Sequence, residues 1–394
     1  MGLTTSQKIL IIILALLAFG LIMVYSSSYF KQSQDGFFYL KKQMIMMGIG
    51  LTAMIIAMRI PYQFWAKISP ILMLITWGLL ILVRIPGIGH IAGGARRWLK
   101  LGPLGFQPSE LAKIVLVIFI AGFISRYPEQ VKSFKKGFIP LSIATGFTVL
   151  LIMVEPDIGT SVFIILLAGI LLMIGGLKLR YIIPVGAIGV TLMMVAVILF
   201  YPHAQSRLND FLHPSADIAG KGYQKHQALI GLGAGGLTGS GLGLSYQKLY
   251  YLPQQHTDFI LAIVGEELGF AGALTVILLF LAILFFGRKL SLESPDKFGS
   301  LLAIGIGTMI VLQALINMAV VTALMPTKGI SLPLISYGGS GLLVTLFAVG
   351  IFLNIARQSE KNITRQEAPP ERPNTQIGST LQGSKIVSAI HTKY

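Results

Sequence analysis

Long apolar runs recur along this chain, and they constrain its fold more than any other feature of the sequence. Each run covers roughly 20 residues, the length that a helix needs to cross the hydrocarbon core of a bilayer. About ten runs are present, at 9–28, 39–58, 68–84, 109–125, 138–155, 157–176, 181–201, 258–286, 299–321 and 338–356. Charged residues make up only 12% of the chain, about half of their share in soluble domains. The sequence therefore predicts an all-α integral membrane protein with about ten transmembrane helices.

The distribution of Lys and Arg predicts which helix ends face the cytoplasm. An even number of spans places both termini on one side, and inner loops normally carry more Lys and Arg than outer loops. With both termini in the cytoplasm, the inner side holds more of the 31 Lys and Arg residues. Two large extracellular loops follow, 84–108 between helices 3 and 4 and 202–257 between helices 7 and 8. We expect 1–357 to form the membrane domain and 358–394, which is polar and contains several prolines, to be a disordered cytoplasmic tail.

Positive charge remains in the predicted outer loops, although the topology rule disfavours it there. The net charge of the chain is +16, and an anionic ligand at the outer leaflet would explain the outer cations most simply. The chain contains no Cys, which excludes disulfides, iron–sulfur clusters and cysteine-ligated zinc.

The first outer loop reads GARRWLKLGPLGFQPSELAK and carries Arg96, Arg97, Trp98 and Lys100. Interfacial anchoring and snorkelling would account for an aromatic residue and cations at this depth. Three cations beside one indole exceed that need, because Arg suits phosphate and an indole face suits a sugar ring. We therefore regard these four side chains as candidate ligand contacts.

Carboxylates occupy two further places near the outer rim. Glu110 and Lys113 lie three residues apart on one helical face, where they can form a structural ion pair. Glu155 and Asp157 flank a proline in EPDIGT, between two apolar runs. Carboxylates beside hydrocarbon often mark function, whereas Asp157 also suits the start of the following helix as a cap.

The stretch SYQKLYYLPQQHTDFILAIVGEELGFAG, at 245–272, is the most informative part of the sequence. Asp258 lies at the outer start of the eighth helix, where it is either a simple cap or a functional group within a dense polar set that includes Lys248 and His256. Glu266 and Glu267 follow on the same helix. Two adjacent carboxylates at this depth require buried partners or a role in proton transfer.

The last motif, MPTKGISLPLISYGGSG at 325–341, combines two prolines with several glycines before the tenth helix. Irregular backbone at membrane depth is tolerated where it lines a cavity or is buried in protein. Lys328 is a further outer cation near the same mouth, and Ser336 is a candidate polar contact for a ligand.

These motifs resemble the shape, elongation, division and sporulation (SEDS) family of bacterial cell-wall proteins, most closely its FtsW and SpoVE branch. The similarity covers about 9–356, and RRWLKLGPLGFQPSELAK, EPDIGT, GGLTGSGLGLSYQKLYYLPQQHTDFILAIVGEELG and PTKGISLPLISYGGSG occur in the family's order. The resemblance implies a ten-helix peptidoglycan glycosyltransferase of the bacterial cytoplasmic membrane, with its active site facing outward. It would polymerise lipid II together with a class B penicillin-binding transpeptidase and other division or sporulation proteins.

The resemblance also implies roles for individual residues. Asp258 matches the essential aspartate, which would take the proton of the acceptor hydroxyl in an inverting transfer that releases undecaprenyl diphosphate. The candidate contacts to lipid II are Arg96, Arg97, Trp98, Lys100, Lys113, Lys248, His256, Lys328 and Ser336, and the supporting carboxylates are Glu110, Glu155, Asp157, Glu266 and Glu267. A carboxylate at a helix N-terminus should have a low pKa, so either burial offsets that effect or Asp258 helps to hold Mg²⁺ or Mn²⁺. No organic cofactor and no nucleic acid are implied.

Two other functions remain open at this point. A lipid II flippase would use Glu155, Asp157, Glu266 or Glu267 as proton or ion sites, and a third possibility is a non-enzymatic division scaffold. A carrier should place its site at the midplane between two repeats. The polar groups cluster instead at the outer mouth, which favours the enzyme. The motifs do not distinguish division from sporulation.

Overall fold

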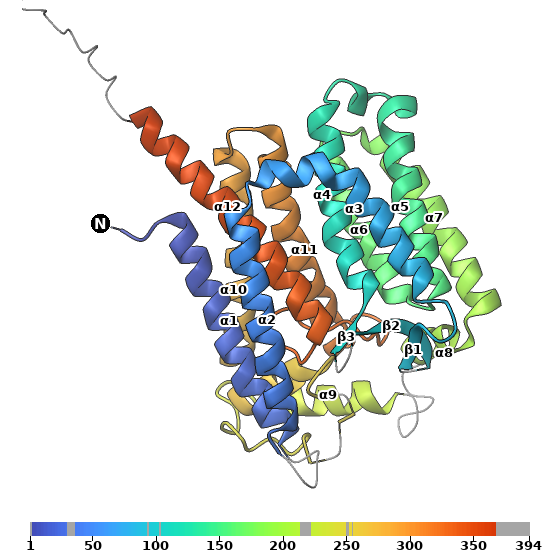
Figure 1. Cartoon of the computed structure of the whole chain (residues 1–394). Helices are drawn as coiled ribbons and strands as arrows, with labels where there is room; N and C mark the ends of the chain where they lie inside the picture. The colour runs from blue at the N-terminus through green and yellow to red at the C-terminus, as the bar shows by residue number, and fades with distance from the viewer. Residues whose placement is uncertain are drawn as a thin grey trace, which may run out of the picture.

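The computed structural model describes residues 2–29, 36–92, 94–101, 104–212, 222–249, 252–253 and 255–367. It is a bundle of long helices (Figure 1), which confirms the predicted all-α membrane fold. Within these ranges, nine helical spans are long and apolar enough to cross a membrane. They are α1 (Thr5–Ser28), α2 (Phe38–Arg59), α3 (Tyr62–Leu82), α4 (Pro108–Arg126), the span Phe134–Val154 that contains α5 (Ile139–Val154), α7 (Leu179–Phe200), α10 (Ile260–Glu293), α11 (Lys297–Val321) and the part Gly339–Thr364 of α12 (Gly339–Glu367).

A tenth apolar helix, α6 (Ile158–Ile174), is 17 residues long and completes the set that the apolar runs predict. Short helical turns at Gln130–Lys132 and Phe134–Phe138 precede α5. α12 runs on to Glu367, so the predicted start of the tail at 358 falls within this helix, while 368–394 lie outside the described residues.

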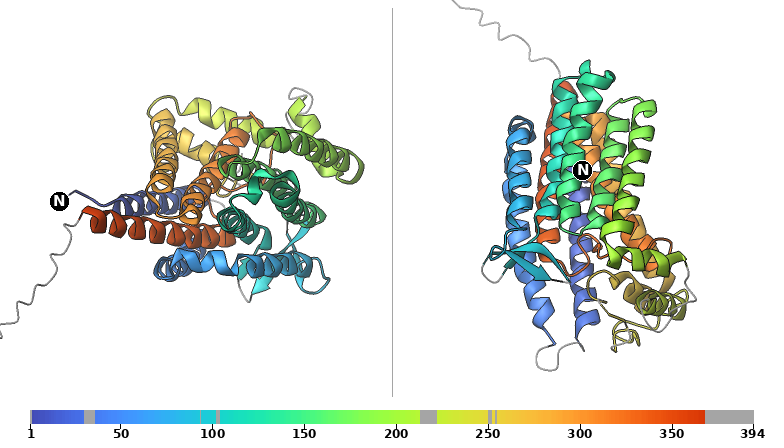
Figure 2. Two further views of the ribbon diagram at one scale, coloured as in Figure 1. Left: turned by 90° about the horizontal axis from the view of Figure 1, so that it is seen from above. Right: turned by 90° about the vertical axis from the view of Figure 1, so that its right-hand side faces the viewer.

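The two ends of the described chain meet at one end of the bundle. The backbone N–H of Ser6 donates to a carboxylate oxygen of Glu360 at 2.6 Å, and the Ser6 hydroxyl donates to its other oxygen at 3.0 Å. α1 therefore begins beside the last turns of α12 (Figure 2). Termini that meet in this way are what an even number of crossings requires.

Helices α4, α11 and α12 form the centre of the bundle. In each of them, 72–78% of an apolar stretch of 18 residues is buried inside the protein. A helix that is apolar on all sides is stable in that position, because it has no face for water. Small residues let the central helices approach closely: a Cβ on Gly287 of α10 would lie 3.5 Å from the Cα of Gly307 on α11. α7 is peripheral, because only 11% of its apolar 18-residue stretch is buried.

The predicted outer loops are folded. A three-stranded antiparallel sheet, in the order β1-β2-β3, is formed by Gly89–Ala92, Ala95–Leu101 and Leu104–Phe106. The second loop contributes α8 (Pro202–Leu212) and α9 (Tyr223–Ala234). Sheet and short helices lie at the end of the bundle opposite the contact between α1 and α12 (Figures 1 and 2).

α10 differs from the regular helix that the sequence predicts, because Gly269 interrupts it with a φ of 65° and a ψ of −164°. The backbone N–H groups of Phe270 and Ala271 turn instead to the carbonyls of Gly236 and Leu237, at 2.9 and 3.1 Å. The glycine-rich stretch before α10 thus packs against the break. Glu266 and Glu267 consequently lie in a short first segment of α10, before the break.

Candidate functional site

Asp258 lies in the turn that leads into α10, and it does not cap that helix. The N-cap residue is Phe259, which makes no side-chain capping bond. The backbone carbonyl of Asp258 accepts a hydrogen bond of 2.7 Å from the Asn317 amide on α11. Among the described residues, its carboxylate has no hydrogen-bond or ion-pair partner, so the interpretation of Asp258 as a simple cap is wrong.

Burial raises the pKa of Asp258 from its ordinary value of 3.8 to about 7, and the nearby charge of Arg207 on α8 acts in the opposite direction. Of the two alternatives left by the sequence, burial therefore does offset the low pKa expected of a carboxylate at a helix N-terminus. The carboxylate precedes the N-cap and is withdrawn from water, so its desolvation outweighs the helix dipole. A pKa near 7 suits a group that must both accept and release a proton at neutral pH.

The segment between α11 and α12 forms one wall beside Asp258. Gly329 packs directly against the carboxylate, because a Cβ at this position would lie 3.1 Å from Asp258 Oδ2. The side-chain stem of the preceding residue, Lys328, reaches α6, where a Cβ on Gly159 would lie 3.2 Å from it. Burial lowers the pKa of Lys328 to about 8, while the charge of Asp157 opposes that shift. Lys328 is thus a partly desolvated cation on the side of α6 and Asp157, one residue before the glycine that packs against the Asp258 carboxylate.

Ser336 belongs to the same wall and fixes the turn that carries Asp258. Its hydroxyl donates to the backbone carbonyl of Thr257 at 2.6 Å and accepts from the backbone N–H of Leu332 at 2.9 Å. The Asn317 amide also donates to the carbonyl of Ile330 at 2.8 Å. Ser336, predicted as a ligand contact, therefore places its hydroxyl on backbone groups.

A second buried cation lies where α4 meets α11. Lys113 Nζ is 2.7 Å from Glu110 Oε2 and donates to Gln313 Oε1 at 2.7 Å. Gln313 in turn donates to the Ser331 carbonyl at 3.0 Å. The predicted structural ion pair is confirmed, and these contacts connect it to the wall beside Asp258.

The cations of β2 point in different directions. Arg97 donates to the Glu155 carbonyl at 2.8 Å and to the Pro156 carbonyl, so it holds the turn between α5 and α6. Arg96 donates to the carbonyl of Arg84 at 3.2 Å, within the sheet loop. The structure therefore does not gather both guanidinium groups with Lys328.

Trp98 lies next to Gly105 across the sheet, where a Cβ would come within 3.2 Å of the indole ring, and Lys100 is exposed. The indole packs on the protein itself along this edge, so only part of its surface is left for a sugar.

The two carboxylates of EPDIGT have different environments. Asp157 caps α6, since its oxygens accept from the backbone N–H and the hydroxyl of Thr160 at 3.1 and 2.9 Å; the capping interpretation is correct. Glu155 is fully buried, and its oxygens have no hydrogen-bond partner among the described residues. Burial, helped by the charge of Asp157, raises the pKa of Glu155 to about 8 against the effect of Arg97. Glu155 is therefore mainly protonated at neutral pH.

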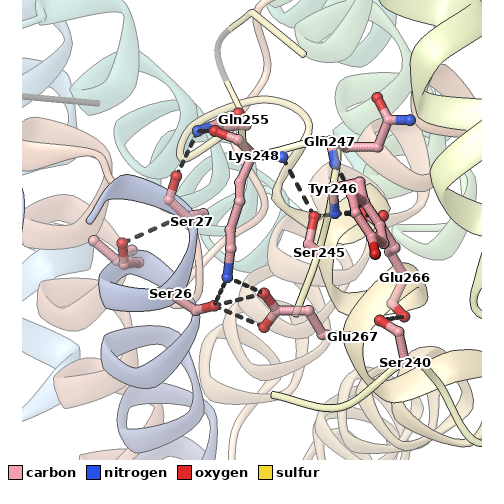
Figure 3. A network of polar contacts seen from close by, with 11 residues as sticks. Ser26, Ser27, Ser240, Ser245, Tyr246, Gln247, Lys248, Gln255, Glu266 and Glu267 are labelled. Carbon is pink, nitrogen blue, oxygen red and sulfur yellow. Dashed lines mark hydrogen bonds and ion pairs between the residues drawn. The ribbon is translucent and has the colours of Figure 1, made fainter. Parts of the chain in front are cut away.

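Lys248, His256, Glu266 and Glu267 are all buried and contact other parts of the protein. Lys248 Nζ lies 2.9 Å from Glu267 Oε1 (Figure 3). The His256 ring packs against the ring of Tyr39, with 4.4 Å between centroids. Lys248, which the sequence predicts as a substrate contact, forms its buried ion pair with Glu267 within the protein.

Asn317 and Gln313 are the two site residues that the sequence reasoning missed. Both lie on α11, four residues apart and therefore on one helical face. Polar amides inside an otherwise apolar span would have been the signal, because a membrane helix carries such groups only where they find partners.

A divalent cation has one suitable carboxylate here. Among the described residues, no three His, Asp or Glu side chains come together as metal ligands. Mg²⁺ is commonly held by one or two carboxylates and substrate phosphates. Asp258 would fit this pattern as the protein ligand beside a diphosphate.

A buried carboxylate with a raised pKa and no partner among the described residues, at one end of a bundle of membrane-crossing helices, defines a polytopic membrane protein with a polar site at its rim. The family profile described as "Cell cycle protein", which groups FtsW, RodA and SpoVE, matches residues 7–361. The chain belongs to this family.

Individual relatives agree over almost their full length. The chain is 41% identical over 360 residues to stage V sporulation protein E of Bacillus subtilis, covering 90% of this chain and 98% of the relative. It is 42% identical over 351 residues to the probable peptidoglycan glycosyltransferase FtsW of Geobacter sulfurreducens, covering 88% and 94%.

Solved structures share the fold. One similar chain comes from a structure that describes the structural coordination of polymerization and crosslinking by a peptidoglycan synthase complex, with a TM-score of 0.73 and 25% identity over 89% of this chain and 97% of that one. The rod shape determining protein RodA of Thermus thermophilus has a TM-score of 0.66 and 26% identity, with coverage of 89% and 96%.

Proposed function

We propose that Asp258 is the general base of the lipid II polymerisation that this peptidoglycan glycosyltransferase catalyses. The observation that carries the proposal is the state of its carboxylate: it has no partner among the described residues, and burial raises its pKa to about 7. Its backbone is meanwhile held on two sides, by Asn317 and by the contact of Ser336 with Thr257. A fixed backbone with an uncommitted carboxylate is what a positioned base requires.

The reaction assigned to this site is a single displacement. The 4-hydroxyl oxygen of the acceptor GlcNAc bonds to the anomeric carbon of the donor MurNAc, and its proton passes to Asp258. The bond from that carbon to the diphosphate breaks on the opposite face, and undecaprenyl diphosphate departs with the electron pair. Configuration inverts, and no covalent sugar–enzyme intermediate is needed.

Charge at the site suits the departing diphosphate. Arg207 of α8 is the cation whose charge acts on Asp258, and Lys328, in the wall between α11 and α12, lies one residue before the glycine that packs on the carboxylate. Fixed cations in a desolvated place stabilise developing negative charge more strongly than they would in water. We assign the diphosphate to this side of Asp258. Lys113, Arg96 and Arg97 then act by holding the surrounding backbone, given the contacts they make.

A divalent cation, Mg²⁺ or Mn²⁺, fits the same place as a cofactor. When bound, it would neutralise charge on the diphosphate oxygens, with Asp258 as its protein ligand. The two roles of Asp258 differ in a measurable way. If Asp258 is the base, Asp258→Asn abolishes turnover at every metal concentration. If Asp258 is a metal ligand, Asp258→Asn lowers turnover, and excess Mg²⁺ or Mn²⁺ restores part of it.

We further propose that the site faces outward and that the chain acts with a class B penicillin-binding transpeptidase. The site lies at the end of the bundle opposite the two described chain ends, which the distribution of Lys and Arg places in the cytoplasm. The similarity to a chain of a peptidoglycan synthase complex supports the partner. The carrier hypothesis loses support at two of its four carboxylates, because Glu266 and Glu267 are occupied by contacts within the protein.

The test supplies labelled lipid II to the purified full-length protein, with and without its cognate transpeptidase, under varied Mg²⁺ and Mn²⁺. We expect glycan polymer on a gel from the wild-type complex and none from Asp258→Asn. Vesicles that show lipid II translocation but no polymer under all these conditions would contradict the glycosyltransferase.

A further inference from the structure

The segment that presents Asp258 has little hydrogen bonding of its own. Between Gly239 and Phe259, the described residues form turns and bends but no helix or strand. Buried backbone N–H groups in such a segment need partners elsewhere. Several of them donate hydrogen bonds to acceptors in the first segment of α10.

Glu266 is the main acceptor for this segment. Its carboxylate accepts from the backbone N–H groups of Tyr246 and Gln247 at 2.8 and 3.3 Å, and from the hydroxyl of Ser245 (Figure 3). Its backbone carbonyl accepts from the N–H and the hydroxyl of Ser240, both at 2.9 Å. One residue of α10 thus anchors the segment at two places.

Glu267 points to the other side and joins three elements. Its carboxylate accepts from the Ser26 hydroxyl of α1 at 2.7 Å and lies 2.9 Å from Lys248 Nζ in the segment (Figure 3). The side chains of Lys248 and Glu267 are 3% and 0% exposed. A charge this deeply buried is tolerated only when its partner stays in place.

Gln255 extends these contacts to within three residues of Asp258. Its amide nitrogen donates to the carbonyl of Ser27 on α1 at 2.6 Å and to the carbonyl of Lys248 at 3.1 Å. The chain before Asp258 is therefore tied to the same end of α1 that contacts Glu267.

We propose that Lys248, Glu266 and Glu267 are positioning residues that hold Asp258 in its reactive place by tying segment 239–258 to α1 and to the first segment of α10. The inference rests on the proposed function and adds the contacts that keep Asp258 in position for it. None of the three side chains contacts the Asp258 carboxylate, so their effect passes through the backbone of the segment. The adjacent carboxylates thereby have a role that needs no transported proton or ion.

Loss of one member of the ion pair leaves the other charge buried and unpaired. Neutralising that group by a proton still leaves the segment without its contact, so the segment is free to move toward water. In Lys248→Met, segment 239–258 loosens and Asp258 becomes more exposed. Its pKa then falls toward the ordinary range, because burial is what raises it. The acid limb of the pH–rate profile should shift to lower pH by about one unit or more.

The first measurement is hydrogen exchange in the full-length wild type and in Lys248→Met. We expect exchange in peptides covering 239–258 to be at least tenfold faster in the variant, with α4, α11 and α12 unchanged. The matched control is Lys132→Met, which removes an exposed pair with Glu129, 3.4 Å apart, and should change nothing. Faster exchange throughout the variant would overturn the proposal, since these residues would then serve general stability.

The second measurement is turnover of lipid II by the complex with the transpeptidase. We expect Lys248→Met and Glu267→Gln each to lower kcat at least tenfold with KM within twofold, and Lys248→Arg to retain most activity. Exchange of the two charges, Lys248→Glu with Glu267→Lys, should recover part of the loss, because contacting residues are coupled.

Wild-type kcat in Lys248→Met, or an equal loss in Lys248→Arg, would overturn the positioning role while leaving the proposed function standing. An inactive wild type would count against the proposed function alone, because hydrogen exchange would still report whether Lys248 holds segment 239–258 against α1 and α10. If Lys248→Met does not fold, Lys248→Arg and the charge exchange decide the matter.

Discussion

Asp258→Asn should inactivate the protein and stabilise it at the same time. Asn has nearly the same shape as Asp but cannot take a proton or become charged. If Asp258 is the base, polymerisation should fall by about 10²- to 10⁴-fold, the usual contribution of a general base. Because the charge of Arg207 compensates the buried carboxylate only in part, removal of the carboxylate charge should also relieve a cost of folding.

The magnitude follows from the pKa of Asp258, which rises from 3.8 to about 7 on folding. A rise of roughly three units corresponds to about 4 kcal/mol, and partial exposure of the side chain reduces this to about 2–4 kcal/mol. The sign is set by linkage: a raised pKa contributes stability that is full below pH 3.8 and is lost as the pH rises through about 7. The advantage of Asp258→Asn should therefore be absent near pH 4 and largest above pH 7.

The assay is thermal unfolding of wild type and variant in one detergent between pH 4.5 and 8.5, with lipid II polymerisation measured in parallel. The control is Asp296→Ala, which removes the α11 cap that accepts from the Gly299 N–H at 2.8 Å and from the Tyr62 hydroxyl. It should lower stability by about 1–3 kcal/mol and leave polymerisation intact. If the Tm difference between Asp258→Asn and wild type does not grow with pH, burial does not control this carboxylate. Wild-type polymerisation by Asp258→Asn would remove it from catalysis.

Three further outcomes follow from the contacts around the site. Asn317→Ala leaves the carbonyls of Asp258 and Ile330 without their donor, which should lower the free energy of unfolding by about 1–3 kcal/mol for each carbonyl. Steady-state kinetics should show kcat lowered at least tenfold with little change in KM. Glu155→Gln should be more stable than wild type at pH 9 and equal to it at pH 4, because the raised pKa of Glu155 costs stability as the carboxyl ionises; a constant Tm difference would contradict this. Ser336→Ala removes the hydroxyl that bridges Thr257 and Leu332, and its kcat should fall while lipid II binding in a filter assay stays unchanged.

Much of the fold was predictable because it is local. An apolar run of about 20 residues specifies a membrane helix wherever it occurs, and the short α6 was found in this way although it has 17 residues. The folded outer loops were not predicted. The strands of the sheet are three to seven residues long and pair only with one another, so no sequence period distinguishes them from an irregular loop.

In the candidate site, too, local sequence specified some contacts, whereas others depend on segments that are distant in the chain. Local spacing correctly indicated the pair of Glu110 with Lys113 and the cap at Asp157. The partner of Lys248 could not be inferred, because Glu267 faces it only after segment 239–258 folds onto the first segment of α10. Arg97 likewise finds its carbonyls on a turn 58 residues away in sequence.

The sequence by itself determined that this protein lies in a membrane and that polar chemistry gathers in a few motifs near one rim. Apolar length and charge distribution act through the solvent, so they need no knowledge of neighbouring segments. Only the tertiary structure decided which polar groups bind one another and which are left for a ligand. Asp258 became a candidate base because burial raised its pKa while its neighbours satisfied one another, and burial is a property of the packed chain rather than of any residue within it.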